Sequence, residues 1–307
     1  MVIARCFFQT FYGSSSKRGR AITPETDSLS RDETGQGEAI MAKFFAITII
    51  VIAIASAIPI LLHTWVAPED ISTHGHMIDE QMSETMAEAG ISFLAAQLIL
   101  ALFIWQFSNP RPDAKIKSFP GGAKALVIAA LLFVGAEVLA LGVFGVKAWA
   151  NVYLTPPSAN AMPIQVQAGQ FAFYFRYPGP DGKLGPIHPE LINEGSQNFY
   201  GLDPEHDPDS KDDIVTAEMA IPVNKEIHLL MHAKDVGHSF FVRELRVQQD
   251  FVPGLDVSLH FTATKVGKYE IVCTQLCGLG HYNMKAYLDV LSQQDFDDWL
   301  KKEQAMQ

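Results

Sequence analysis

The chain has 307 residues, of which 48% are hydrophobic and only 19% are charged, and its mean hydropathy is +0.11. A charged fraction this low excludes a disordered acidic chain, and the positive hydropathy indicates membrane segments. The formal net charge of −11, from 23 basic and 34 acidic residues, argues against nucleic acid as a partner. The three cysteines, Cys6, Cys273 and Cys277, are too few for a fold built on disulfides.

Residues 1–43 precede the first apolar stretch and contain serine and arginine but no acidic residue before Glu25. This composition is faintly similar to a transit peptide. It fits a disordered tail, or a start of translation at Met41 rather than Met1, at least as well. We therefore expect a tail or a wrongly assigned start.

Three apolar stretches follow, each long enough to cross a bilayer as a helix of about 20 residues. They cover residues 44–62, 86–107 and 125–150 and together define a predicted transmembrane region, 44–150. The alternative is that all three stretches are buried core helices of a protein in water. The first stretch, taken alone, also resembles a signal sequence. Glu137, in the third stretch, is either a functional carboxylate or a polar contact between helices.

Basic residues are distributed unequally between the connecting segments. Lys and Arg occur before the first stretch and between the second and third, whereas residues 63–85 contain neither. By the positive-inside rule, the N-terminus faces the cytoplasm and everything after Asn151 lies outside. We expect a bacterial inner-membrane protein with an external C-terminal domain, with the mitochondrial inner membrane as the alternative.

Residues 151–307 have the pattern of an antiparallel β-sandwich, because short Val-, Ile-, Phe- and Tyr-rich runs alternate with turn residues. The region 293–302 predicts a short amphipathic helix, and 185–213 predicts a long acidic loop. The predicted strands are 163–167, 170–177, 218–222, 226–233, 239–242, 245–250, 256–262, 267–273 and 285–291. The predicted fold class is thus N-terminal transmembrane helices followed by an all-β sandwich.

The chemistry is concentrated in the pattern C-x3-C-x3-H-x2-M, formed by Cys273, Cys277, His281 and Met284. Soft sulfur ligands favour copper over hard cations. A mononuclear blue-copper site needs one cysteine, whereas two thiolates can bridge two copper ions and share one electron over both. His238 is the candidate for the further imidazole, because loops cluster at one end of a sandwich.

Other readings of the same residues stay open. An external pair of cysteines can form a disulfide. Two cysteines and two histidines can hold structural zinc, although Met284 would then have no role. The cysteines can also be unrelated core residues. Among the remaining histidines, we expect His74 and His76 to be solvated, and one of His228 and His232 to line the sandwich core.

The copper loop and the His238 motif occur together with several further segments, at 170–178, 212–215, 221–223, 249–254 and 296–300. From about residue 87 to 300 the chain therefore resembles subunit II of the haem–copper cytochrome c oxidases, which carries the dinuclear CuA centre. The resemblance implies a cupredoxin-like sandwich. It also implies oxidase subunit I, further membrane subunits and a c-type cytochrome or similar donor as partners.

Carried over residue by residue, the resemblance implies that Cys273 and Cys277 bridge two copper ions. His238 and His281 would each bind one ion, Met284 would be the weak ligand of one, and Gln275 would offer its backbone carbonyl to the other. Asp235 and Ser239 would orient the ligands, as metal-bound imidazoles usually require.

The chain departs from the family at two places. Most members have Glu where this chain has Gln275, and that side chain also binds Mg²⁺. A neutral amide is a poorer Mg²⁺ ligand, so no Mg²⁺ is claimed. The aromatic run that usually contains Trp is Phe171-Ala-Phe-Tyr here. Phe173 or Tyr174 is the expected point of electron entry, unless both are ordinary strand aromatics.

We expect a subunit that passes electrons from a c-type cytochrome through dinuclear copper to haem in subunit I, where oxygen is reduced to water. The chain would belong to an oxidoreductase complex without being catalytic alone. The alternatives are the copper subunit of a nitric oxide reductase and a membrane-anchored copper chaperone or sensor.

Overall fold

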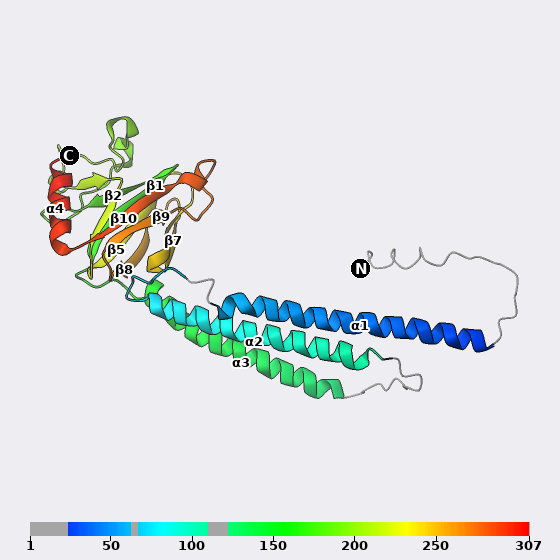
Figure 1. Ribbon diagram of the computed structural model, residues 1–307. Coiled ribbons are helices and arrows are strands. Elements are labelled where there is room, and N and C mark those ends of the chain that lie inside the picture. The colour runs from blue at the N-terminus through cyan, green and yellow to red at the C-terminus, as the bar shows by residue number, and fades with distance from the viewer. Residues whose placement is uncertain (1–23, 63–66, 110–121, 307) are drawn as a thin grey trace. The chain divides into compact units, whose positions relative to one another are not determined.

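The computed structural model describes residues 24–62, 67–109 and 122–306, and its ribbon is traced in Figure 1. The part of the predicted tail up to residue 23, with Cys6, lies outside the described residues. The chain separates into two compact units. One holds α1 and the C-terminal part of α2, and the other holds the N-terminal part of α2, α3 and all that follows.

Three long helices correspond to the apolar stretches: α1 (Pro24–Leu61), α2 (Gly75–Phe107) and α3 (Gly122–Tyr153). All three are long and apolar enough to cross a membrane, with mean hydropathies of 2.7, 2.0 and 2.6 over their apolar windows. Each begins before the stretch that predicted it. For α2 the reason is local, because the Ser72 hydroxyl accepts a hydrogen bond from the Gly75 N–H and caps the helix.

The helices leave most of their large apolar side chains exposed. Leu61, Phe107 and Leu132 are each at least 70% exposed, and at most 11% of any apolar window is buried. A protein in water rarely leaves so much apolar surface uncovered. This exposure is typical of a membrane-anchored protein, and it argues against three buried core helices.

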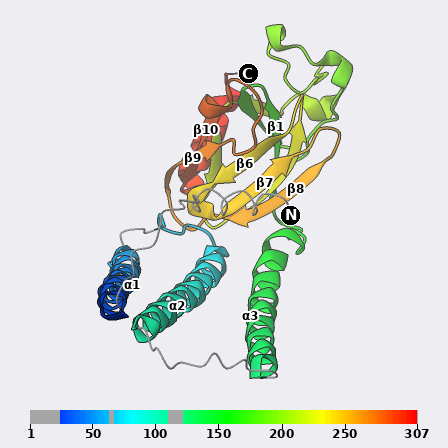
Figure 2. The same cartoon turned by 90° about the vertical axis from the view of Figure 1, so that its right-hand side faces the viewer.

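The C-terminal region is a sandwich of two five-stranded sheets (Figures 1 and 2). The first has the order β3-β2-β1-β5-β8 and the second has the order β4-β10-β9-β6-β7. The strands of the first sheet are β1 (Met162–Gly169), β2 (Ala172–Tyr177), β3 (Ile214–Thr216), β5 (Glu226–Ala233) and β8 (Val257–Thr262). Those of the second are β4 (Met219–Pro222), β6 (His238–Val242), β7 (Val247–Phe251), β9 (Gly267–Val272) and β10 (Lys285–Leu291).

The predicted architecture of helices followed by a β-sandwich is confirmed, but the prediction of a purely antiparallel sandwich is wrong. β1 pairs with β5 and β4 pairs with β10 in parallel, while the other pairs are antiparallel. Alternation of apolar residues has the same period in both arrangements, so it does not distinguish them. β3 was not predicted, because three residues are too few to display an alternation.

The core lies between the two sheets. The alternation of side chains along each strand produces this core. It is clearest in β5 and β10, where every second residue is buried and its neighbours are at least partly exposed. Each fully buried Leu or Phe side chain stabilises the fold by about 1.5–3 kcal/mol. The predicted C-terminal helix is present as α4 (Gln293–Gln304; Figure 1). Its Phe296 and Trp299 pack against the buried Tyr177.

A segment before α2 is part of the sandwich. Ile71 is 1% exposed, and its N–H donates to the Glu244 carbonyl at 3.0 Å while its own carbonyl accepts from Thr264 N–H at 2.7 Å. Ser72 forms a bridge with Ala263. The compact unit of the sandwich therefore includes residues well before 151, where the sequence analysis began its external domain.

Candidate metal centre

Three segments build the candidate site: two carry the ligands and one supports them. Residues 273–284 connect β9 to β10, His238 is the first residue of β6, and residues 170–171 form the turn between β1 and β2. A hydrogen bond of 3.1 Å from Cys273 N–H to the Met284 carbonyl closes the base of the long connection, which we call the ligand loop (residues 273–284). The loop thus begins and ends on two adjacent strands.

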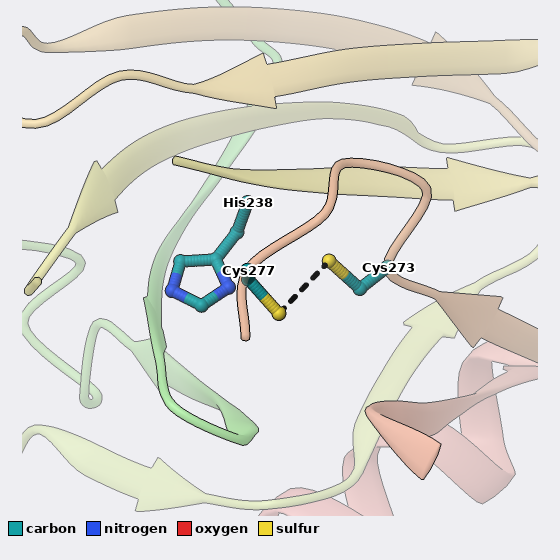
Figure 3. Close-up of side chains that lie close together, drawn as sticks. All are labelled: His238, Cys273 and Cys277. Atoms are coloured by element: carbon teal, nitrogen blue, oxygen red, sulfur yellow. Dashed lines mark hydrogen bonds between the residues drawn. The ribbon is translucent and has the colours of Figure 1, made fainter. Parts of the chain in front are cut away.

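Three of the predicted ligands converge closely. His238, Cys273 and Cys277 are buried, and each offers one ligand atom within 4.8 Å of the others. Figure 3 shows the imidazole of His238 beside the two thiols, with the dashed contact between the sulfur atoms. The two Sγ atoms lie 3.8 Å apart. This is well beyond the S–S bond length of about 2.05 Å, so the cysteines form no disulfide in this structure.

The remaining predicted ligands lie against the same thiols. His281 Nδ1 and Met284 Sδ are each 3.7 Å from Cys277 Sγ. The backbone carbonyl of Gln275 is 3.2 Å from Cys273 Sγ, while the Gln275 side chain is exposed. The structure therefore brings together two thiols, two imidazoles, one thioether and one carbonyl, which are the donors that the sequence analysis named.

The two ring nitrogens of His238 have different surroundings, and this tests whether the site suits a metal. Nε2 lies 2.7 Å from Asp235 Oδ1, whereas Nδ1 is buried and has no hydrogen-bond partner among the described residues. A buried polar atom without a partner costs about 1–3 kcal/mol. A metal ion bound at Nδ1 removes this cost, and a donor set dominated by sulfur and imidazole suits copper.

The protein favours the neutral form of the Cys277 thiol when no cation is bound. Burial, followed by the neighbouring Cys273 thiol, raises the pKa of Cys277 to about 11. A bound cation reverses this preference, because it stabilises the thiolate directly. The site is therefore arranged to release protons when metal binds.

Asp235 connects the ligands to the β1–β2 turn. Burial alone would raise its pKa, but hydrogen bonds from His238 and from the N–H groups of Gln170 and Val236 outweigh burial and lower it. Both N–H bonds are 2.7 Å long. The ionised carboxylate is thus placed to fix the orientation of the His238 ring.

The structure gives Ser239 a different partner from the predicted one. Its side chain is buried, and its hydroxyl donates to the Gln249 carbonyl of β7 at 3.4 Å rather than to a ligand imidazole. Successive side chains of a strand point to opposite faces, so the residue after His238 faces away from the ligands.

Two residues of the β1–β2 turn support the ligand loop and were not singled out from the sequence. The Gln170 side chain donates to the Cys277 carbonyl at 2.6 Å. A Cβ atom added to Gly278 or Gly280 would lie 3.2 Å or 2.5 Å from the nearest ring atom of Phe171, so the ring covers both glycines. Phe171 keeps 40% of its surface exposed. The glycines in the ligand loop were the available signal, because they allow such a close approach.

The two aromatic residues predicted for electron entry have different surroundings. Phe173 is only 2% exposed and packs in the core against Phe251, so it offers no edge to an incoming protein. Tyr174 stacks on Phe199 with ring centroids 3.8 Å apart, and it lines a surface cavity that Gln170 and Phe171 also line. Side chains alternate along β2, which explains why one faces the core and the next does not.

The other histidines correct two expectations. His74 was expected to be solvated but is 7% exposed, whereas His76 is exposed as predicted. His228 and His232 share the outer face of β5, where they contact Ser258 and Asp256 respectively, so neither lines the core. The segment containing His74 is buried because it runs along β8.

A family model matches residues 207–291 of this chain, and its description is "Cytochrome C oxidase subunit II, periplasmic domain". The match includes the whole ligand loop and His238. It covers less than a third of the chain, so it describes the sandwich rather than the helices.

Curated relatives extend the similarity toward the N-terminus. An alternative cytochrome c oxidase subunit 2 from Bradyrhizobium diazoefficiens is 28% identical over 260 residues, 84% of this chain and 91% of that protein. The cytochrome c oxidase subunit 2 of Cereibacter sphaeroides is 26% identical over 223 residues, 70% of this chain and 71% of that one. That of Thermostichus vulcanus is 43% identical, but over 93 residues that span 30% of this chain and 28% of that protein.

Proposed function

We propose that this chain, a cytochrome c oxidase subunit II-like protein, is the electron-entry subunit of a haem–copper terminal oxidase. It would accept electrons from a c-type cytochrome or a similar donor and pass them to haem in subunit I, where oxygen is reduced to water. The observation that carries the proposal is the convergence of six donor groups around the two thiols, and one of these donors is the buried, unpartnered Nδ1 of His238.

The residues divide into strong and weak ligands. Cys273 and Cys277 would hold two copper ions as thiolates, with His238 and His281 binding through the Nδ1 atoms that face the thiols. Met284 would contribute its thioether and Gln275 its carbonyl. Bound dinuclear copper supplies a one-electron acceptor whose charge is shared over both ions.

Burial of the ligands supports an electron carrier over a copper chaperone. Cys273 and Cys277 are 7% and 3% exposed, and His238 is fully buried. A chaperone must present its ligands to a second protein for exchange, whereas an electron carrier benefits from excluding water and holding its ligands rigidly. The rigid support by Asp235 and Gln170 fits the second role.

Phe171 is the proposed point of electron entry in place of the buried Phe173, and Tyr174 lines the same surface cavity as Phe171. The Phe171 ring covers the ligand loop on one side and is 40% exposed on the other. An electron donor that docks on this ring would approach the ligands without unfolding any part of the loop.

The exposed apolar helices support a place inside a membrane complex. We propose that they contact lipid, subunit I and further membrane subunits, with the sandwich on the periplasmic side of a bacterial inner membrane, or on the equivalent side of the mitochondrial inner membrane. Helices α1, α2 and α3 would then serve as the membrane anchor, and the sandwich with the segment around Ile71 as the electron-accepting domain.

Copper binding by the full chain in detergent tests the proposal first. Metal analysis should find two copper ions per chain, and electron paramagnetic resonance should show one unpaired electron shared over two copper nuclei. One copper ion per chain, or a preference for zinc, would contradict the dinuclear assignment.

The purified oxidase complex tests the electron path. We expect Cys277→Ser to abolish electron uptake from a reduced c-type cytochrome, because serine is a hard and poorly acidic ligand that cannot replace a bridging thiolate. The control variant Thr274→Ser changes an exposed residue of the same loop and should leave electron uptake unchanged. A Cys277→Ser complex that takes up electrons at the normal rate would mean that electrons bypass the site. Nitric oxide in place of oxygen as the reduced substrate would instead support a nitric oxide reductase.

A further inference from the structure

A second pair of imidazoles, His74 and His260, lies outside the ligand loop and lines a cavity of about 240 Å³. The cavity is bounded by the segment before α2, the end of α3, the first residue of β5 and the last residues of β8. It is lined by Thr73, His74, Asn151, Val152, Thr155, Glu226, His260, Phe261 and Thr262. All of these residues belong to the same compact unit.

His74 is held in this cavity with one ring nitrogen free. The residue is 7% exposed, and its Nε2 is buried without a hydrogen-bond partner among the described residues. Burial is the main cause that lowers the pKa of His74, with Asp70 and a backbone hydrogen bond to Leu245 acting in the opposite direction. The ring is therefore neutral near pH 7, which is the form that binds metal ions.

His260 presents the same arrangement from β8. Its side chain is 17% exposed, and its Nδ1 lies 3.3 Å from Glu226 Oε1. Its Nε2 is buried and has no partner in the described part of the chain. A histidine that donates one ring N–H to a carboxylate keeps its other nitrogen as a lone-pair donor, and this is the usual arrangement of a metal-bound imidazole.

Glu226 is itself fixed in place. The N–H group of Ser158 donates to its Oε1 at 3.2 Å, and the Ser158 hydroxyl donates to its other oxygen. These bonds and the contact with His260 lower the pKa of Glu226, with the Ser158 side chain as the largest cause. The neighbouring His228 is not available to the cavity in the same way, because its Nε2 is bonded to Ser258 Oγ at 2.8 Å.

We propose that this cavity binds a divalent transition-metal ion such as Zn²⁺ through Nε2 of His74 and Nε2 of His260. Glu226 orients His260, and water completes the coordination. Imidazole ligands suit Zn²⁺ and related ions, and two protein ligands leave the ion exchangeable. The alternative occupant is water alone, which would satisfy the two nitrogens by hydrogen bonds.

Zinc binding by the copper-loaded full chain in detergent tests the proposal, because copper blocks the ligand loop. Equilibrium dialysis against Zn²⁺ should find one equivalent that is lost in His74→Gln and in His260→Gln. The matched control is His76→Gln, which changes an exposed histidine two residues away that lines a separate acidic pocket. An unchanged copper spectrum shows that each variant retains the folded sandwich.

X-ray absorption at the zinc edge decides the case even if a variant does not fold. Scattering from two imidazoles in the wild-type chain supports the site. Carboxylate ligands without imidazole would overturn it. The absence of any bound equivalent, or an equivalent that survives in both His74→Gln and His260→Gln, would also overturn it and leave water as the occupant.

Discussion

His238 uses its two ring nitrogens differently, and this difference defines the candidate centre at the scale of single residues. Nε2 is engaged by Asp235, so Nδ1 is left as the atom directed at the thiols. The other donors differ in strength, because thiolates and imidazoles bind copper firmly while a thioether or a carbonyl binds weakly. Substitutions at weak and strong donors should therefore have separable effects.

Met284→Leu should keep both copper ions but raise the reduction potential. Removing a weak donor makes the oxidised form less stable without dismantling the thiolate core. The swap conserves volume at a residue that is 2% exposed, so it should cost less than about 1.5 kcal/mol of folding stability. Redox titration of the full chain measures the effect, with the exposed Leu279→Met as the control. Loss of one copper ion in Met284→Leu would show that the thioether is a strong ligand.

Gln275→Glu should leave the copper spectrum nearly unchanged. The Gln275 carbonyl faces Cys273 Sγ, while its side chain is exposed, so the change does not touch the donor atom. The new carboxylate should raise the affinity of the assembled complex for Mg²⁺ or Mn²⁺. Leu276→Glu adds the same charge one position later and should not raise this affinity. A copper spectrum altered only in Gln275→Glu would assign the ligand role to the side chain.

At the scale of elements, the ligand loop depends on the β1–β2 turn that covers it. Gln170 and Phe171 contact the loop, and Asp235 connects the same turn to His238. The metal site is thus built by the packing of three connections rather than by the loop alone.

Gly280→Ala should weaken copper binding through Phe171. The added Cβ would lie 2.5 Å from a ring atom, so the ring must move, and such overpacking costs about 1–3 kcal/mol. Adding Phe171→Ala should restore copper binding, because it removes the ring that the new Cβ would contact. The φ of −91° at Gly280 suits any residue, so no backbone strain remains. Copper retention against a chelator measures both effects.

Gly278→Ala provides the contrast to this pair. Its φ of +134° disfavours any residue with a Cβ, so the backbone strain remains after Phe171→Ala. If Phe171→Ala restored copper binding in Gly278→Ala as fully as in Gly280→Ala, the ring contact and not the backbone conformation would explain the need for glycine at both positions.

At the scale of the whole molecule, charge and apolar surface are separated along the chain. The helices expose large apolar side chains, whereas residues 151–307 carry 12 basic and 21 acidic residues, a balance of −9. The acidic region is the part that meets water and any soluble electron donor.

The rate of association with a basic c-type cytochrome should therefore fall as salt is added. Opposite charges steer the encounter at low ionic strength, and salt screens them over about 10 Å at 0.1 M. Stopped-flow electron transfer to the assembled complex measures the rate, and an acidic cytochrome serves as the control. If the rate for the basic donor did not depend on salt, the acidic charge would not steer association and would contribute only to solubility.

The sequence alone determined the features that depend on residue type and spacing. Long apolar runs predicted three helices, alternation predicted nine of the strands, and the spacing of Cys273, Cys277, His281 and Met284 predicted a soft-metal site. These signals are local, because a helix or strand displays its pattern within its own residues. His238 is distant from this loop in the sequence, and it was predicted from the clustering of sandwich loops and from the resemblance of its motif to oxidase subunit II.

Only the tertiary structure decided which residues support that site and which are buried. Strand order, the two parallel pairs, the burial of Ser239 and Phe173, and the cover of Phe171 over the ligand loop all depend on contacts between segments distant in sequence. The same holds for His74, whose polar surroundings in the sequence predicted solvent exposure. Pairing of its segment with β8 places it in a cavity, since burial is a property of the packed chain and not of the residue.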